Sequence, residues 1–284
     1  MFEWSEVCGA ERPGAMRVAV MGIVNVTPDS FSDGGQFLDA DAAIAHGLAL
    51  VEAGADLLDV GGESTRPGAD PVDDVEERRR VLPVIEALAV QVGVPVSVDT
   101  AKASVADAAL GAGARIVNDV SAGRNDPDLL GVVAHHGAGY IAMHMQGEPR
   151  TMQDAPHYGD VVREVGDFLA DRAEVARAAG IADGALALDP GIGFGKTAAH
   201  NLELLAHLDA LVARLDVPIV IGASRKRFLG VLLGDDAADR RDDGTLATTV
   251  WCVGLGARVV RVHDVRSTTR AIGLYRVMAE ADAA

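Results

Sequence analysis

Cysteine, aromatic residues and positive charge are all scarce in this sequence of 284 residues. Its two cysteines, Cys8 and Cys252, are too few for a multi-thiolate metal site, and their wide separation gives no support for a disulfide. An apolar run of about 18 residues is also missing, and no secretory leader is visible, so we expect no membrane span and no export. The formal charge of −17 disfavours nucleic acid and anionic membranes as partners, because both attract basic surfaces. Together these absences predict a globular protein of the cytoplasm.

Hydrophobic residues make up 49% of the chain, and their spacing predicts strands that alternate with helices. The predicted strands are almost continuously apolar, as is typical of parallel sheets that helices cover on both faces. Several predicted helices end at a Gly-Ala pair, where glycine can adopt the left-handed conformation that terminates a helix. These glycines are Gly54, Gly113, Gly137 and Gly256. The predicted strands span residues 17–26, 56–62, 94–100, 115–121, 139–145, 185–191, 218–224 and 258–265.

Eight such strand–helix units fill the chain from residue 17 to residue 281 with no linker between them. We therefore predict an α/β fold, a (β/α)8 TIM barrel that forms a single domain over residues 16–284. A doubly wound open sheet is the alternative architecture. Residues 1–15 match no recognisable pattern, and we expect them to be an N-terminal leader that need not be ordered.

Every predicted strand ends in polar residues, and working sites in a barrel of this kind lie at the carboxyl ends of the strands. Such residues often serve only as helix caps or turn formers. Asp99, Asn118 and Asp189 stand at inward positions, however, and their oxygens and amide suit the N–H edge of a flat heterocycle. Because buried carboxylates require partners, we interpret these residues as ligand-binding groups.

A second set of strand-end residues carries positive charge in an otherwise acidic chain. Arg66, Arg261 and His263, together with Asn25, predict an anion site of the kind that a phosphate-bearing ligand selects. A lone histidine is more often structural, but the Arg-x-His spacing of residues 261 and 263 places both side chains on one face of a strand.

The tract LDPGIGFGKT has the Gly-Lys-Thr of a nucleotide-binding P-loop. That motif needs four residues between its two glycines, whereas three separate Gly191 from Gly195. We therefore reject a P-loop and predict that Lys196, Thr197 and the glycines shape a loop around Phe194, whose ring can lie against a flat ligand.

Eight segments, in this order, closely resemble the signatures of bacterial dihydropteroate synthases, the sulfonamide-inhibited enzymes of folate biosynthesis within the pterin-binding TIM-barrel family. They are MGIVNVTPDSFSDGG, DVGGESTRPGA, SVDTAK, NDVS, MHMQGEPRTMQ, LDPGIGFGKT, GASRKRFLG and RVHDV. The resemblance covers residues 16 to 280. It implies a homodimeric transferase that joins 6-hydroxymethyl-7,8-dihydropterin pyrophosphate to para-aminobenzoate, giving 7,8-dihydropteroate and pyrophosphate with Mg2+ assistance.

The same resemblance implies a role for individual residues. The pterin would be held by Asp99, Asn118, Asp189 and Lys226, with Met143 under its ring. Asn25 would reach the metal and the pyrophosphate, and the pyrophosphate would also contact Arg66, Arg261 and His263. The aminobenzoate side would consist of Thr65, Pro67, Phe194 and Lys226. The implied catalytic residues are Asp99, Asp189, Lys226, Arg261 and His263.

Two other functions use a similar barrel. A pterin- or folate-binding methyltransferase would need neither an arylamine site nor a pyrophosphate cluster, and a catalytically silent paralogue would have lost strand-end residues. The chain departs from the family pattern at Ala122, where glycine is frequent, and at Arg227, where several members carry serine. The second departure leaves open which group meets the aminobenzoate carboxylate.

Overall fold

A computed structural model describes residues 1–9, 17–27, 36–64, 69–148, 150–235 and 237–282 of the chain. All the paired strands run parallel, in the order β6-β5-β4-β3-β2-β1-β8-β7. A bridge between Leu188 and Ile219 joins β6 to β7 and closes the sheet into a barrel. The strands are β1 (Ala19–Asn25), β2 (Leu57–Gly61), β3 (Val96–Asp99), β4 (Ile116–Asp119), β5 (Gly139–Met143), β6 (Leu186–Asp189), β7 (Val220–Ile221) and β8 (Val259–Val262). The prediction of a TIM barrel is confirmed.

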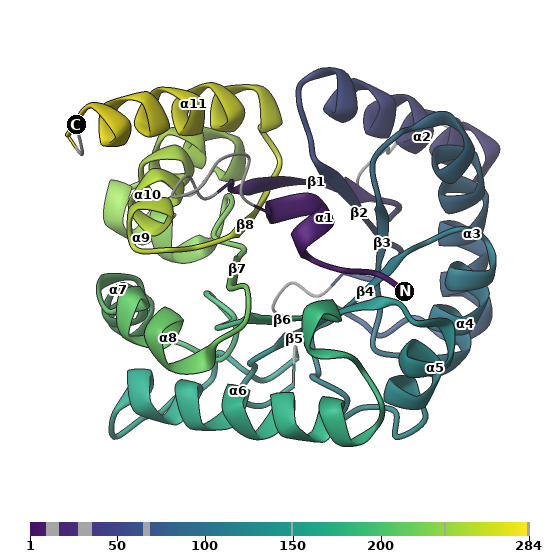
Figure 1. The fold of residues 1–284 in the computed structure, drawn as a ribbon, viewed down its shortest axis with the longest axis horizontal. Coiled ribbons are helices and arrows are strands. Elements are labelled where there is room, and N and C mark those ends of the chain that lie inside the picture. The colour runs from purple at the N-terminus through teal and green to yellow at the C-terminus, as the bar shows by residue number, and fades with distance from the viewer. Residues whose placement is uncertain (10–16, 28–35, 65–68, 149, 236, 283–284) are drawn as a thin grey trace.

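Except for α1, which lies across one end of the barrel, the helices lie outside the strands and surround them, as Figure 1 shows. They are α1 (Ser5–Cys8), α2 (Gln36–Glu52), α3 (Asp74–Gln91), α4 (Ala103–Gly111), α5 (Leu129–His136), α6 (Val161–Ala178), α7 (Ala198–Ala206), α8 (Leu208–Leu215), α9 (Arg227–Leu233), α10 (Asp242–Gly254) and α11 (Val265–Asp282). Short 3-10 helices span Asp183–Ala185 and Ala238–Arg241. Within the described part of the chain, no helix is both long and apolar enough to cross a membrane.

Left-handed glycines end several helices at the predicted positions. Gly54, Gly113, Gly137 and Gly256 all have positive φ angles, between 59° and 111°. Ala122 also has a positive φ, 54°, although it carries a β-carbon. Glycine adopts this conformation without a steric penalty, which gives a physical reason for the glycine that the family resemblance implies at this position.

Two apolar layers form the core. The larger layer lies between strands and helices and includes Val24, Leu58, Val98 and Leu169. The smaller layer lies inside the barrel, where inward side chains of several strands meet. It contains Ala19, Met21, Leu57, Ile116, Ile141, Ala187, Val220 and Val259.

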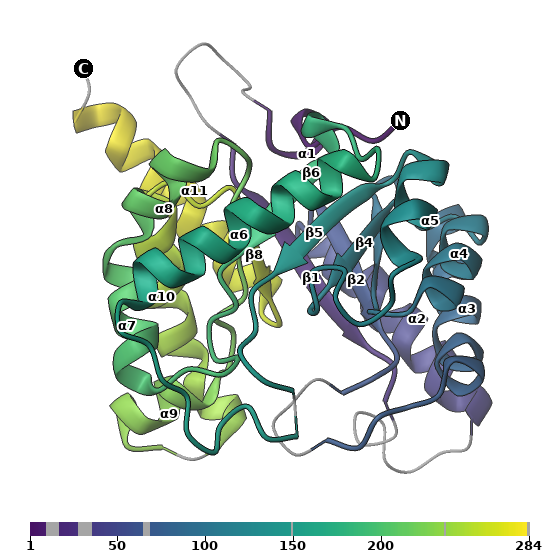
Figure 2. The same cartoon turned by 90° about the horizontal axis from the view of Figure 1, so that it is seen from below.

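Residues 1–9 belong to the inner layer, which differs from the expected N-terminal leader. Phe2 and Trp4 are almost fully buried and pack edge to face, with ring centroids 5.2 Å apart. The Trp4 indole donates a hydrogen bond to the Ala185 carbonyl at 3.0 Å, and the Phe2 amide donates to the Gly137 carbonyl at 2.8 Å. The segment closes the amino-terminal end of the barrel, where Figures 1 and 2 show α1. The burial of two large rings explains why residues 1–9 are ordered, which sequence periodicity did not predict.

Candidate active site

Polar side chains replace apolar ones in the barrel interior toward the carboxyl ends of the strands. Side chains two residues apart on a strand point to the same face, so each polar residue lies directly beyond an inner-layer residue. The pairs are Leu57 and Asp59, Ile116 and Asn118, Ala187 and Asp189, and Val259 and Arg261. Asp99 takes the equivalent place on β3, opposite Gly61 and Asn118 in the strand register.

Arg261 lies at the centre of one half of this interior. Its Nε donates to Asp59 Oδ2 at 2.6 Å, and its Nη2 donates to Asp99 Oδ2 at 2.9 Å. Asn118 Nδ2 donates to the same Asp59 oxygen at 2.9 Å. A guanidinium that bridges two buried carboxylates compensates the cost of removing their charges from water. This arrangement differs from the predicted anion site, because Arg261 already contacts the carboxylates of the heterocycle-binding group.

Asp189 and Lys226 occupy the other half, around Gly222. A β-carbon added at Gly222 would lie 3.7 Å from Asp189 Oδ2, 3.9 Å from Lys226 Nζ and 3.9 Å from Arg261 Cβ. Three of the predicted site residues therefore surround one point where the chain has no side chain. Asp189 Oδ1 also accepts the Gly191 amide at 2.7 Å.

Burial shifts the pKa values of these charged groups. Burial and the charge of Asp59 raise the pKa of Asp99 to about 7, against the opposing effect of Arg261. Burial also raises the pKa of Asp189, although Lys226 and the Gly191 amide act in the other direction. Burial lowers the pKa of Lys226 to about 8, and Asp189 limits that decrease. Perturbed groups clustered at one end of a barrel are typical of an active site.

The loop after β6 shapes one wall of the site. Lys226 Nζ donates to the Ile192 carbonyl and lies 4.4 Å from the centre of the Phe194 ring, a cation–π contact. Met143, at the end of β5, belongs to a buried cluster against which Phe194 packs. Met143, which was predicted to lie under the pterin, and Phe194, which was predicted to contact the aminobenzoate, are thus brought together with Lys226, which was predicted to contact both.

Lys196 stabilises that loop through hydrogen bonds to its backbone carbonyls. Its buried ammonium contacts His144 Nδ1 at 2.8 Å, the Gly191 carbonyl at 2.9 Å and the Phe194 carbonyl at 3.0 Å. Thr197 caps α7 through the His200 amide. The prediction that Lys196 and Thr197 shape this loop is confirmed, and the three acceptors around Lys196 explain how a lysine is accommodated in the interior.

Some strand-end polar residues serve the loops instead of the site. Asp119 accepts hydrogen bonds from the Ser121 and Gly123 amides and from the Tyr140 hydroxyl at 2.8 Å. His144 contacts Lys196, and burial together with that neighbouring charge lowers the pKa of His144 to about 2. The neutral imidazole can therefore accept a hydrogen bond from Lys196 Nζ.

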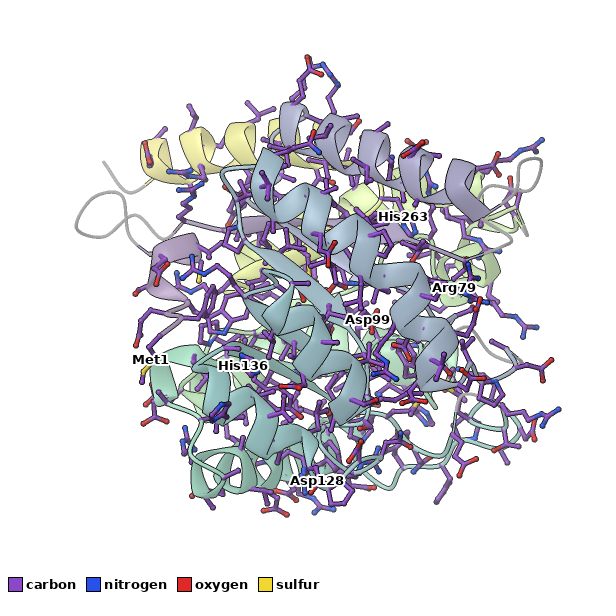
Figure 3. The ribbon with its side chains drawn as sticks, turned by 90° about the vertical axis from the view of Figure 1, so that its right-hand side faces the viewer. Met1, Arg79, Asp99, Asp128, His136 and His263 are labelled. Carbon is purple, nitrogen blue, oxygen red and sulfur yellow. The ribbon has the colours of Figure 1, made fainter. Side chains whose placement is uncertain are left out.

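His263 lies two residues beyond Arg261, just after the end of β8. Its Nδ1 is 2.9 Å from Ser224 Oγ, which also accepts the His263 amide at 3.2 Å. Figure 3 shows His263 and Asp99 toward the side of the molecule away from Met1. Asn25 ends β1 and is half-buried, opposite Gly61. The predicted residues Thr65, Arg66 and Pro67 lie outside the described residues.

Asp59 is the site residue that the sequence analysis missed. It is fully buried and accepts from both Arg261 and Asn118. Its signal was a carboxylate inside an otherwise apolar strand, DLLDVGG, two residues before the strand end. A charge at such a position needs a buried partner, which makes it a site candidate even where the partner is unknown.

Comparisons with known proteins agree with this arrangement. A family model described as "Pterin binding enzyme" matches residues 21–263. The dihydropteroate synthase of Mycobacterium leprae is 51% identical over 261 residues, which cover 90% of this chain and 91% of that protein. Xanthomonas albilineans dihydropteroate synthase with 4-aminobenzoic acid superposes with a TM-score of 0.88 at 49% identity, covering 94% and 96% of the two chains. The same enzyme in complex with 7,8-dihydropteroate gives a TM-score of 0.84 at 46% identity, covering 94% and 97%.

Proposed function

The chain belongs to the pterin-binding enzyme family and has the dihydropteroate synthase activity of its relatives, and on that premise we propose how its own residues perform the reaction. The reaction condenses 6-hydroxymethyl-7,8-dihydropterin pyrophosphate with para-aminobenzoate and releases pyrophosphate. The convergence of Asp99, Asp189 and Lys226 inside one end of the barrel is the observation that carries the proposal.

Asp99, Asn118, Asp189 and Lys226 bind the pterin. The carboxylates and the Asn118 amide oxygen accept from ring N–H groups, and the Lys226 ammonium donates to a ring acceptor. Met143 packs beneath the ring, next to Phe194. Asp59 orients the group through its bonds to Asn118 and Arg261.

Arg261, His263, Arg66 and Asn25 act on the pyrophosphate side. The two carboxylate bonds of Arg261 engage Nε and Nη2, and a guanidinium has five N–H donors, so donors remain for an anion. His263, two residues farther along the chain than Arg261, is held by Ser224. Thr65 and Pro67, with Phe194 and Lys226, form the aminobenzoate side.

The family is consistent with a requirement for a divalent metal, and we propose that this metal is Mg2+. The side-chain oxygen of Asn25 suits this ion. No group of three or more acidic, histidine or cysteine side chains suited to a metal lies within the described ranges. Mg2+ is commonly held by one or two protein oxygens together with substrate phosphates and water. The Asn25 side-chain oxygen at the end of β1 suits that role, and the bound metal would supply charge stabilisation for the departing pyrophosphate.

The chain's own residues act mainly through electrostatic stabilisation of the charges that develop during the reaction. The aromatic amine is neutral and nucleophilic near pH 7, so the reaction needs no side chain as a base to create the attacking species. The nitrogen lone pair forms the new C–N bond as the C–O bond to pyrophosphate breaks, and the amine then loses a proton. Asp99 and Asp189 stabilise the positive charge that develops on the exocyclic carbon, while Arg261, His263 and Arg66 stabilise the negative charge on the leaving group.

Arylamine-dependent release of pyrophosphate tests the activity. The purified chain is incubated with the pterin pyrophosphate and Mg2+, with and without para-aminobenzoate, and both pyrophosphate and dihydropteroate are measured. We expect equal amounts of both products only when the arylamine is present. Binding of pterin without release would support the silent paralogue, and binding of a methyl-bearing folate without arylamine turnover would support the methyltransferase.

We also propose that two copies form a homodimer through α9, α10 and α11. These helices are neighbours in Figures 1 and 2 and carry large apolar side chains that are about half or more exposed. The side chains are Val231, Leu232, Leu233, Trp251, Leu274, Val277 and Met278. Such a concentration of exposed apolar groups is typical of an interface. Light scattering should give a dimer for the unchanged chain and a monomer for Leu274→Lys; a monomer in both would contradict the proposal.

The cytoplasm is the compartment that we propose for this activity. Cys8 and Cys252 are both free thiols and both buried. Unpaired cysteines of this kind fit a reducing compartment. Fractionation of the source cells, with the synthase assay as readout, should recover the activity with the cytoplasmic marker.

A further inference from the structure

One residue between β7 and α9 has a backbone conformation that its side chain disfavours. Arg225 has a φ of 56°, although it carries a β-carbon. Such residues rarely adopt this left-handed conformation unless surrounding contacts hold them in it, and they are frequent at functional sites. Arg225 stands directly between Ser224, which holds His263, and Lys226, which the proposed function assigns to the pterin. Its conformation therefore affects the direction in which both neighbouring side chains leave the backbone.

Contacts with residues 241–245 hold Arg225 through its side chain, its amide and its carbonyl. The guanidinium makes two hydrogen bonds with Asp242: Nε donates to Oδ1 at 2.7 Å, and Nη2 donates to Oδ2 at 2.8 Å. The Arg225 amide donates to Thr245 Oγ1 at 3.0 Å, and the Arg225 carbonyl accepts from Arg241 Nη1 at 3.0 Å. A guanidinium–carboxylate pair with two bonds fixes orientation as well as distance. We call these four residues the Arg225 anchor.

The inner part of the anchor is packed tightly. Arg241 and Thr245 are buried, and the Thr245 hydroxyl donates to the Arg241 carbonyl at 2.9 Å. A β-carbon added at Gly230, on α9, would lie 2.7 Å from Arg241 Nε, so the guanidinium fits closely against that helix. The side chains of Arg225 and Asp242, by contrast, are each about one third exposed. The ion pair can therefore be changed with little loss of core packing.

Both neighbours of Arg225 contact residues of the proposed site. Lys226 Nζ lies 4.4 Å from the centre of the Phe194 ring. Ser224 Oγ lies 2.9 Å from His263 Nδ1 and accepts the His263 amide at 3.2 Å. The turn formed by residues 224–226 therefore contributes to the pterin side and to the pyrophosphate side at once.

We propose that Asp242 is a positioning residue for Lys226 and Ser224. It acts through Arg225, whose left-handed backbone conformation it stabilises, and it stands on α10, away from the ends of the barrel strands. This inference rests on the proposed function, which gives Lys226 and His263 their roles. Displacement of binding groups by about 1 Å can lower reactivity about a hundredfold, so partial release of the turn has a measurable effect.

Asp242→Asn tests the proposal by calorimetry, steady-state kinetics and hydrogen exchange. The substitution keeps the shape of the side chain and replaces a charged pair with a weaker hydrogen bond. We expect the Kd for free 6-hydroxymethyl-7,8-dihydropterin to rise about tenfold, and kcat/KM for its pyrophosphate to fall about thirtyfold because Ser224 also releases His263. Hydrogen exchange at the Arg225 amide should become faster. An unchanged Kd for the free pterin would overturn the positioning role.

A glycine substitution at the strained position separates positioning from a loss of stability. Glycine adopts a φ near 56° without a steric penalty, so in Arg225→Gly the turn no longer depends on the ion pair. We expect Arg225→Gly to keep the Kd for the free pterin within about threefold of the unchanged chain. In that background Asp242→Asn should change the Kd less than about twofold, because the two substitutions affect one interaction.

Two results of this cycle would contradict the proposal. A tenfold effect of Asp242→Asn in both backgrounds would show that Asp242 does not act through Arg225. A loss of free-pterin affinity in Arg225→Gly as large as that in Asp242→Asn would show that the site needs the guanidinium and not the backbone conformation.

Asp243→Asn is the matched control. Asp243 is exposed and lies next to Asp242 in the first turn of α10, so its substitution removes the same charge from the same end of the helix. The Kd for the free pterin and the exchange at the Arg225 amide should both stay unchanged, and equal effects in the two variants would overturn the proposal. If the unchanged chain released no pyrophosphate in the presence of arylamine, the proposed function would fail, whereas pterin binding and amide exchange would still report on the anchor.

Discussion

The two ends of the barrel use the same inward strand positions for opposite purposes. At the amino-terminal end, Phe2 and Trp4 close the interior over Leu57 and Ile116. One inward position later the same strands carry Asp59 and Asn118. One barrel therefore uses its two ends differently. Buried apolar rings stabilise the amino-terminal end, whereas buried charged side chains form the site at the carboxyl-terminal end.

Among the described residues, buried carboxylates and cations lie close together at the carboxyl-terminal end. Arg261 binds Asp59 and Asp99, and Lys226 lies near Asp189 around Gly222. Burial raises the pKa values of both Asp99 and Asp189, and the charge of Asp59 adds to the increase for Asp99. A cationic or N–H-rich ligand would stabilise these carboxylates, which agrees with a site built for a pterin.

Replacing Arg261 should have the largest effect, because it should lower both the stability and the activity that depend on the carboxyl-terminal end. Arg261→Met leaves Asp59 and Asp99 without their shared partner, and loss of one member of a buried ion pair costs about 3 to 5 kcal/mol. We expect this loss in urea unfolding and a loss of more than about a hundredfold in kcat/KM. Affinity for a free pterin should also decrease. The effect should not be limited to pyrophosphate, because the guanidinium contacts the carboxylates of both Asp59 and Asp99.

Replacing Trp4 should affect the opposite end alone. Trp4→Ala removes a fully buried indole, and such substitutions cost about 3 to 5 kcal/mol of stability. Both proteins are assayed about 15 °C below the melting temperature of the variant, where the variant remains folded. At that temperature the kcat/KM of the variant should match that of the unchanged chain. A tenfold loss of kcat/KM in the folded variant would show that the two ends are coupled.

Asp189→Asn tests the charge at the site with little change in shape. We expect weaker pterin binding and turnover slowed by at least about tenfold, the equivalent of about 1.4 kcal/mol for one charged hydrogen bond. The Gly191 amide can still donate to the remaining oxygen, so stability should change little. Asp171→Asn, on the outer helix α6, is the matched control. Full activity of Asp189→Asn would remove this residue from the site.

The smallest expected effect concerns stability and pH. Burial raises the pKa of Asp99 from 3.8 to about 7, so folding favours the protonated carboxyl. Its contribution to stability is fully present below pH 4 and is lost as the pH rises toward 7. Asp99→Asn avoids that loss, and its melting temperature should exceed that of the unchanged chain by about 2 to 4 °C at pH 8 but not at pH 4. Activity should nevertheless fall. A lower melting temperature at pH 8 would indicate that the Arg261 bond outweighs the burial of the charge.

Local patterns were sufficient to predict most of the fold. Near-continuous apolar segments gave the strands, and the Gly-Ala pairs at Gly54 and Gly113 gave correct helix ends with positive φ. These features depend on residues close in sequence, so periodicity detects them. The first nine residues escaped prediction because Trp4 is ordered by contacts with Ala185, which lies 181 residues away.

The sequence predicted where the site residues lie more accurately than it predicted which residues they bind. Asp99, Asn118, Asp189, Lys226 and Arg261 converge as expected for residues at the ends of barrel strands. The bonds among them were not predictable, because a strand pattern indicates which face a side chain occupies and not which residue lies across the barrel. Asp119 and His144 also stand at strand ends, but they serve the loops, which a strand pattern alone does not reveal.

The sequence by itself determined the alternation of strands and helices and the inward position of the polar residues, because both follow from periods of a few residues along the chain. Only the tertiary structure decided which charges meet. Barrel closure brings Arg261 to Asp59 and Asp99 across 202 and 162 residues. Buried charges must find partners wherever the fold places them, and that requirement, expressed through long-range packing, turns separate strand ends into one site.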